Sequence, residues 1–185
     1  DPKYRVAADG SDLGRIAQLE EVVRGLSAVR PWADAEEITF ECEPGTLPEG
    51  KLAAIRGLGV TRLSLGVENF DDGILERNGR AHRSPEIFRA WSAARALDFP
   101  QINIDLIAGM VGETDDNWRD CVRRTLDLDP DSVTIYQMEL PYNTTISRDL
   151  LNHTGQFGDG LATWDAKRAW VGEAFAALED AGYHV

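Results

Sequence analysis

Hydrophobic residues along this chain recur with two different spacings, and the spacing alternates from one segment to the next. In the first long segment, apolar residues recur three or four positions apart, at Leu13, Ile16, Leu19, Val22, Val23, Leu26 and Val29. This spacing places them on one face of a helix, so we expect an amphipathic helix over residues 12–30. Similar patterns and helix-start signals predict helices over residues 48–58, 71–78, 84–97, 114–128 and 161–181.

Short runs of β-branched and aromatic residues lie between these helices. The runs "ITFEC", "VTRLSLGV", "INIDLIA" and "SVTIYQME" predict strands over residues 38–42, 60–67, 102–108 and 132–139. Further strands are expected over residues 4–8 and from Tyr183 onward. Because no tight hairpin signal joins these runs, the order predicts βα units on a parallel sheet of about five or six strands. The expected fold class is α/β, as an open sheet or a βα barrel.

Composition and charge narrow the possible partners. The 185 residues suit one domain, and a hydrophobic content of 43% is enough for an ordinary core. The net charge of −13 disfavours nucleic acid and anionic membrane surfaces, which attract basic faces. No apolar stretch reaches the roughly 20 residues of a membrane span. We therefore expect a cytoplasmic protein with no nucleic-acid or membrane partner.

Metal ligands are sparse in this sequence. Cys42 and Cys121 are the only cysteines, and they are far apart without zinc or disulfide spacing. The histidines, His82, His153 and His184, are scattered as well. The sequence thus predicts no metal site within this chain.

Carboxylates lie in or directly after several of the predicted strands. Glu41, Glu68, Asp105 and Glu139 occupy such positions, and the carboxyl ends of parallel strands meet at one edge of a sheet, where α/β proteins bind ligands. Asp105 interrupts an apolar strand, where an unpaired carboxylate costs several kcal/mol. We expect its donor to be an arginine of the protein or a polar ligand.

Glu68 is followed twelve residues later by Arg80, at the return of a short helical segment. Placed as opposite poles of one polar site, the two side chains would suit a zwitterionic or hydroxyl-bearing ligand. The alternative is an internal Glu68–Arg80 ion pair without a ligand.

Several common catalytic patterns are absent. There is no GxxxxGK[ST] phosphate loop and no GxSxG nucleophile motif. A lyase or aldolase that uses Asp105 and Glu139 as acid and base would need a Schiff-base lysine or a metal. The lysines, Lys3, Lys51 and Lys167, lie at no predicted strand end.

Four segments in order resemble one enzyme family. "ITFECEPGTL", "GVTRLSLGVENFDDGILERNGRAH", "FPQINIDLIAGMVGET" and "DSVTIYQMELPYNT" are similar to the radical S-adenosylmethionine (SAM) superfamily, in the branch of oxygen-independent coproporphyrinogen III oxidases. The resemblance implies an open (β/α)6-type barrel that binds SAM beside a [4Fe-4S] cluster. It places SAM contacts at Glu41, Glu68, Arg80, Asp105 and Ile107, with Arg80 on the methionyl carboxylate and Glu68 and Asp105 toward the ribose hydroxyls.

The same resemblance implies a function. Reductive cleavage of SAM would give a 5′-deoxyadenosyl radical, and in the named oxidases this leads to oxidative decarboxylation of porphyrinogen propionates in heme biosynthesis. The implied partners are a small-molecule substrate such as a tetrapyrrole and an electron donor protein. The alternatives are a related heme-binding or methyl-transferring radical SAM protein, or a non-catalytic module that binds SAM or heme.

Two features depart from the family pattern. The family commonly has Gln at the position of Glu68, and the cluster-binding CxxxCxxC motif is missing, since two cysteines cannot supply three thiolates. We therefore expect residues 1–185 to be a single radical SAM core domain, a fragment without its cluster-binding loop and C-terminal part, and inactive by itself.

Overall fold

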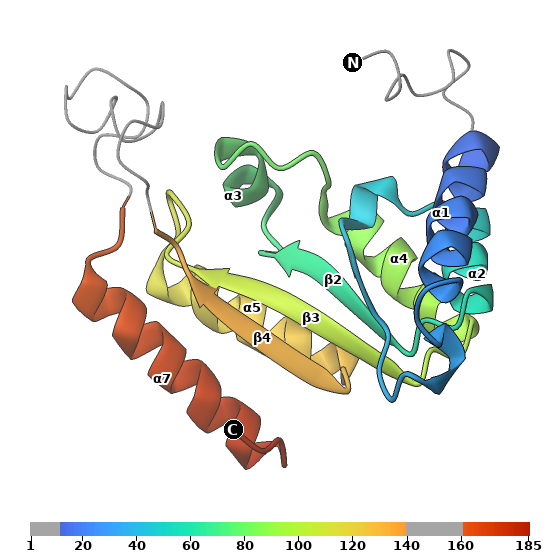
Figure 1. The fold of residues 1–185 in the computed structure, drawn as a ribbon. Coiled ribbons are helices and arrows are strands. Elements are labelled where there is room, and N and C mark those ends of the chain that lie inside the picture. Colours follow the sequence, from blue (N-terminus) through green and yellow to red (C-terminus); the bar gives the residue numbers. More distant parts are fainter. Residues whose placement is uncertain (1–11, 140–160) are drawn as a thin grey trace.

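A four-stranded parallel sheet organises the structure (Figure 1). The computed structural model describes residues 12–139 and 161–185. Its strands are β1 (Thr39–Cys42), β2 (Arg62–Glu68), β3 (Gln101–Ala108) and β4 (Ser132–Gln137), and their spatial order follows the chain, β1-β2-β3-β4. Every neighbouring pair is parallel, as crossover helices require.

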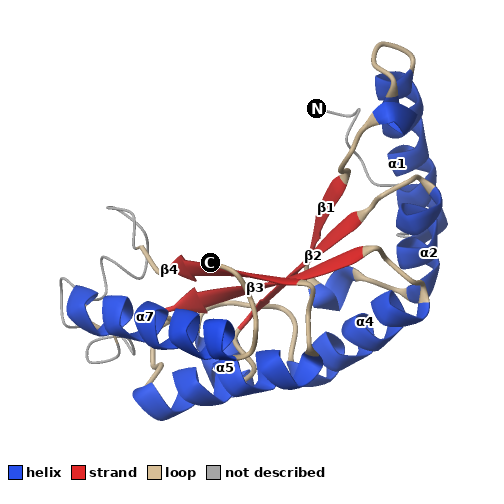
Figure 2. Ribbon diagram, turned by 90° about the horizontal axis from the view of Figure 1, so that it is seen from below, coloured by secondary structure: helices blue, strands red, loops and turns tan. Residues whose placement is uncertain are grey.

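Helices lie along one face of the sheet (Figure 2), and those between consecutive strands make the parallel crossovers. They are α1 (Asp12–Ser27), α2 (Glu49–Gly57), α3 (Asp72–Arg77), α4 (Ser84–Ala96), α5 (Asp115–Leu128) and α7 (Trp164–Asp180). Two short 3-10 turns, Trp32–Asp34 and Pro44–Thr46, flank β1. Within the described segments the other face of the sheet carries no helix, so its residues are available for a site.

Side chains alternate strictly between the two faces of the central strands. In β2, Leu63, Leu65 and Val67 are fully buried against the helices, and the residues between them face the other side. β3 repeats this pattern, with its even-numbered residues in the core: Ile102, Ile104, Leu106 and Ala108. The open face is therefore polar while the covered face is apolar.

Most predicted elements are confirmed, with ends that differ by a few residues. The described part of the sheet has four strands, and the strand expected over residues 4–8 lies outside the described residues. The strand expected from Tyr183 onward is wrong. Gly182 has φ of +94°, and the amide of Tyr183 donates to the carbonyl of Leu178 at 3.0 Å. These residues close the C-terminal end of α7 in a Schellman motif.

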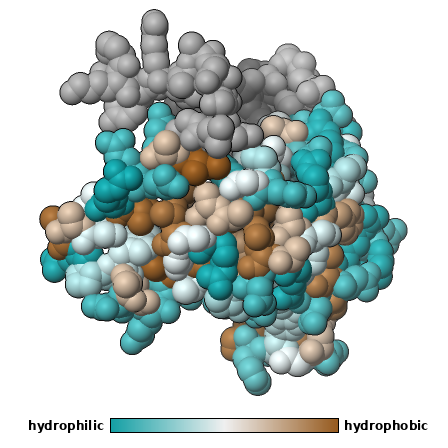
Figure 3. Space-filling model, turned by 90° about the vertical axis from the view of Figure 1, so that its right-hand side faces the viewer, coloured by the Kyte–Doolittle hydropathy of each residue, from teal (hydrophilic) through white to brown (hydrophobic). Residues whose placement is uncertain are grey.

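The first helix forms as predicted, but much of its apolar face remains exposed. Val22 and Leu26 within α1, and Val29 just after it, are exposed, while Leu19 packs against the core. Figure 3 shows hydrophobic residues among hydrophilic ones on the side of the molecule that carries α1 and α2. No helix in the described segments has both the length and the apolar character of a membrane span.

We expect Trp118→Ala to lower the free energy of unfolding by about 3–5 kcal/mol. The side chain is fully buried, stacks on Trp170 with ring centroids 6.4 Å apart, and donates from Nε1 to the Trp170 carbonyl at 2.8 Å. Its removal leaves a cavity between α5 and α7. Denaturant unfolding measures the change, and Trp164→Ala, at an exposed tryptophan, is the control. Equal losses in both variants would contradict this role.

Candidate functional site

A cleft of about 390 Å³ opens at the C-terminal ends of the strands. All five residues that the family resemblance singled out lie in its wall. Their role as SAM ligands stays a prediction, but their common location is a property of the fold. The complete lining is Glu41, Cys42, Glu43, Gly66, Glu68, Arg80, Asp105, Ile107 and Tyr136.

Strand register brings these residues together. Gly66 of β2 pairs with Asp105 of β3, and Ile107 of β3 pairs with Tyr136 of β4. A side chain at Gly66 would enter the cleft, since an added Cβ would lie 3.4 Å from Oε1 of Glu68. Glycine here keeps the centre of the cleft open. The sequence analysis did not identify Gly66 and Tyr136 as site residues. The signal that could have identified them is the alternation of side chains along the predicted strands.

Glu68 sits in an unusual backbone conformation. The register between β2 and β3 shifts between Gly66 and Glu68, and Glu68 has φ of +66°. The amide of Asn69 donates to the carbonyl of Val67 at 2.8 Å, which makes a γ-turn of the rare, strained kind. A non-glycine residue held in such a region costs about 1–3 kcal/mol, and residues of this type cluster at functional sites.

Glu68 and Arg80 contact each other directly. Their side chains are 13% and 35% exposed, and Nη2 of Arg80 lies against Oε2 of Glu68, although this oxygen has no well-aligned hydrogen bond. Burial raises the pKa of Glu68, and the charges of Arg80 and His82 oppose that rise. The structure thus forms the internal ion pair that was the alternative for these two residues, and both line the cleft. Their placement as opposite poles around a ligand stays a prediction.

Asp105 has protein donors other than an arginine, which corrects the expectation from the sequence. Ser64 Oγ donates to Oδ2 of Asp105 at 2.7 Å, and Asn103 Nδ2 donates to Oδ1 at 2.8 Å. Asn103 is fully buried, and its own Oδ1 accepts from Ser132 and Thr134 of β4. Each carboxylate oxygen keeps a free lone pair, so Asp105 can also accept from a ligand hydroxyl.

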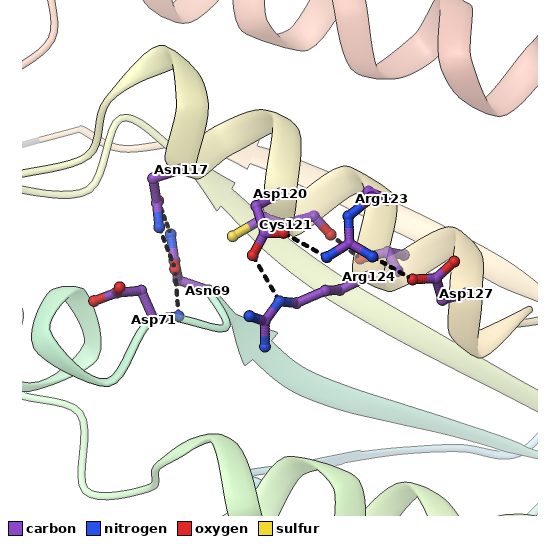
Figure 4. Close-up of polar contacts among 9 residues, drawn as sticks. Asn69, Asp71, Asn117, Asp120, Cys121, Arg123, Arg124 and Asp127 are labelled. Carbon is purple, nitrogen blue, oxygen red and sulfur yellow. Dashed lines mark hydrogen bonds and ion pairs between the residues drawn. The ribbon is translucent and has the colours of Figure 1, made fainter.

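A second polar cluster joins the end of β2 to α5. Asn69 is fully buried, and its Nδ2 donates to Oε1 of Glu113 at 2.8 Å and to Oδ1 of Asn117 at 2.9 Å. Figure 4 shows Asn69 reaching Asn117 on α5. The cluster fixes the residue that directly follows Glu68.

Farther along α5 in the same view, ion pairs lie on the helix surface (Figure 4). Asp120 contacts both Arg123 and Arg124, and the hydrogen bond from Arg123 is the largest cause that lowers the pKa of Asp120. Exposed pairs of this kind contribute little to stability because water and salt screen them. The buried amides, rather than these charges, connect α5 to the site.

Glu113 is a buried carboxylate that sequence reasoning did not single out. It is 7% exposed and accepts from the amides of Gly109 at 2.5 Å and Met110 at 3.2 Å. Burial nevertheless raises the pKa of Glu113 to about 7, against these hydrogen bonds. Glu113 thereby holds the β3–α5 loop, and burial makes its charged form costly there.

Lys167 reaches the strand ends, although the sequence analysis placed no lysine there. From α7, its Nζ donates to the carbonyl of Met138 at 2.7 Å, and its stem packs across Gly109. Burial lowers the pKa of Lys167. Neither Lys167 nor Glu139 lines the cleft that holds Asp105. The cleft lining therefore does not combine the acid, base and amine that a lyase or aldolase would need.

The residues of this chain do not fit an iron–sulfur cluster. The sequence has two cysteines, and the described residues include no group of three possible metal ligands. Burial raises the pKa of Cys42 and of Cys121 to about 12. Both are therefore neutral thiols near neutral pH, whereas cluster ligands are thiolates.

Comparison with known proteins decides the family. Residues 11–125 match the model of the radical SAM superfamily. The chain belongs to this superfamily. Its structure is also similar to that of coproporphyrinogen III oxidase (HemN) from Escherichia coli, described as a radical SAM enzyme, with a TM-score of 0.74, 26% identity, and coverage of 91% of this chain and 38% of that one.

The curated relatives include heme chaperones and a coproporphyrinogen III oxidase. The heme chaperone HemW of Bacillus subtilis is 32% identical over 122 residues (65% of this chain), and that of E. coli is 31% identical over 126 residues (68%). The oxygen-independent coproporphyrinogen III oxidase of Synechocystis is 26% identical over 121 residues (65%) and is covered over 26% of its length. This chain spans 32% of the B. subtilis chaperone and 33% of the E. coli one.

The raised pKa of Glu113 predicts a pH dependence of stability. A carboxyl whose pKa rises on folding stabilises fully below its unfolded value near 4.5, and this contribution is lost as pH rises through about 7. The loss amounts to about 3 kcal/mol. The free energy of unfolding of Glu113→Gln should therefore fall less between these pH values than that of the unaltered protein. Denaturant unfolding at several pH values measures both. Parallel stability curves for the two proteins would contradict the assignment.

Proposed function

We propose that the cleft at the strand ends binds SAM, and that this chain is the SAM-binding core of a longer radical SAM protein. The charge of the cleft carries the proposal. Glu41, Glu43, Glu68 and Asp105 face a single arginine, Arg80. This excess of carboxylates favours a ligand with cationic groups, and SAM has a sulfonium and an ammonium. Nucleotides with several phosphates would be repelled by the same residues.

Five of the lining residues have a chemistry that suits SAM. Arg80 is the cation available for the methionyl carboxylate, and its present partner Glu68 would release it on binding. Glu68 and Asp105 can accept from ribose hydroxyls, with Asp105 oriented beforehand by Ser64 and Asn103. Glu41 adds negative charge beside these groups, and Ile107 supplies an apolar surface.

The cluster that radical SAM chemistry requires would come from residues outside this chain, because the two cysteines here do not fit it. When bound beside such a cluster, SAM supplies a 5′-deoxyadenosyl radical on one-electron reduction. The residues described here have a separate task, which is to bind and orient the cofactor.

We further propose that the longer protein handles heme or a related tetrapyrrole. Relatives named heme chaperone HemW share 32% and 31% identity with this chain, against 26% for the relative named coproporphyrinogen III oxidase. These values favour heme binding over porphyrinogen decarboxylation.

Two assays on the longer protein separate these activities. Heme titration followed by the Soret absorbance should give saturable binding, and incubation with coproporphyrinogen III, SAM and a reductant should give no decarboxylated product. Decarboxylation together with an absence of heme binding would favour the oxidase instead.

For the cofactor site, we expect Arg80→Ala to weaken SAM binding by about 1.5–3 kcal/mol, the range for a charged hydrogen bond. Calorimetric titration of the longer protein with its cluster in place gives the dissociation constant. Arg89→Ala is the matched control, because Arg89 lies on α4 outside the cleft lining. Equal affinity in the Arg80 and Arg89 variants would count against the assignment.

Residues 1–185 by themselves should hold no iron–sulfur cluster. Anaerobic reconstitution with iron and sulfide should give no charge-transfer absorbance, and SAM with a strong reductant should give no deoxyadenosine. The physical reason is the lack of three thiolates on one loop. A stable stoichiometric cluster on this chain would show that its metal ligands had been misassigned.

A further inference from the structure

His82 lies at the junction of the elements that form the cleft. The residue is 1% exposed. Its Nδ1 lies 3.2 Å from Oε1 of Glu43, beyond the end of β1, and its Nε2 lies 3.1 Å from the carbonyl oxygen of Val67, in β2. A Cβ added to Gly45 would approach the Cβ of His82 to 3.2 Å, so the backbone after β1 packs directly on this side chain.

The partners of His82 determine which of its nitrogens carries hydrogen. The Val67 carbonyl is only an acceptor, so Nε2 must be a donor in this contact. Its Nδ1 faces the carboxylate of Glu43. His82 thus bridges the ends of two neighbouring strands, with Nε2 as the donor to Val67.

The Val67 carbonyl is the group that closes the strained turn at Glu68. It accepts from Asn69 within that turn and from His82 across it. A strained backbone conformation persists only where several surrounding contacts hold it in place. His82 therefore stabilises the backbone that points the Glu68 carboxylate into the cleft.

His82 belongs to the same loop as Arg80. Arg83 ties this loop together, because its Nη1 donates to the carbonyl of Arg80 at 2.8 Å and to that of His82 at 2.9 Å. A single buried imidazole thus connects the segments that carry Glu43, Glu68 and Arg80.

We propose that His82 is a positioning residue of the cofactor cleft, which acts on SAM affinity through the Val67 carbonyl and the Glu68 carboxylate without touching the cofactor. The proposal rests on the proposed function, because it assigns a role within the SAM site. It predicts that the Nε2 contact, and not the Nδ1 contact, sets the affinity.

Two substitutions of His82 separate these contacts. The amide nitrogen of glutamine occupies nearly the position of imidazole Nε2, and that of asparagine the position of Nδ1. We expect His82→Gln to keep the SAM dissociation constant within about threefold and His82→Asn to raise it about tenfold, the effect of one buried hydrogen bond. Both are measured by calorimetric titration of the longer protein with its cluster in place. A purely structural role would move both variants equally, and that result would overturn the proposal.

A double-mutant cycle tests the path through Glu68. In a Glu68→Ala background, His82→Asn should change SAM affinity by less than about threefold, because the residue through which it acts is gone. A persistent tenfold loss would overturn the path. If His82→Asn fails to fold, the glutamine variant decides, with retained affinity in support and a loss above threefold against.

The outcomes also separate this inference from the proposed function. SAM binding that Arg80→Ala weakens, together with unchanged affinity in both His82 variants, would overturn the inference alone. A longer protein that binds no SAM would overturn both.

Discussion

The alternation of side chains across a parallel sheet, with helices on only one face, is the constraint on which this structure depends. Leu63, Leu65 and Val67 of β2 point into the helical layer, so Ser64 and Gly66, which lie between them, must face the other way. The neighbouring strands follow the same rule in register. One apolar face secures the fold, and the opposite face is left free to carry polar groups toward the strand ends.

Polar groups on a sheet face need partners, and their pairing shapes the site. Asn103 accepts from β4 and donates toward Asp105 and Ser64, so three strands are joined by side chains as well as by their backbones. Asp105 is thereby oriented before any ligand arrives. Glu68 is less well satisfied, since burial raises its pKa and its main partner is Arg80. Functional sites often contain carboxylates whose pKa values are shifted by burial and by neighbouring charges.

The strained turn at Glu68 is held from two sides. Asn69 is anchored by Glu113 and Asn117 on the α5 side, and His82 holds the Val67 carbonyl from the α3–α4 loop. Because the contacts come from segments far apart in the sequence, the turn is a product of the complete fold. The cost of burying Glu113 is part of the same arrangement.

The sequence by itself determined the order and type of the elements and the carboxylates at the strand ends. Local spacing is sufficient for these, because a helix or a strand is defined by nearby residues, and parallel strands bring Glu41, Glu68 and Asp105 to one edge. Only the tertiary structure decided that Glu68 contacts Arg80, that Asp105 takes its donors from Ser64 and Asn103, and that Tyr183 ends a helix. Partners of buried polar groups come from other segments, and their identity depends on register and packing, which local patterns do not encode.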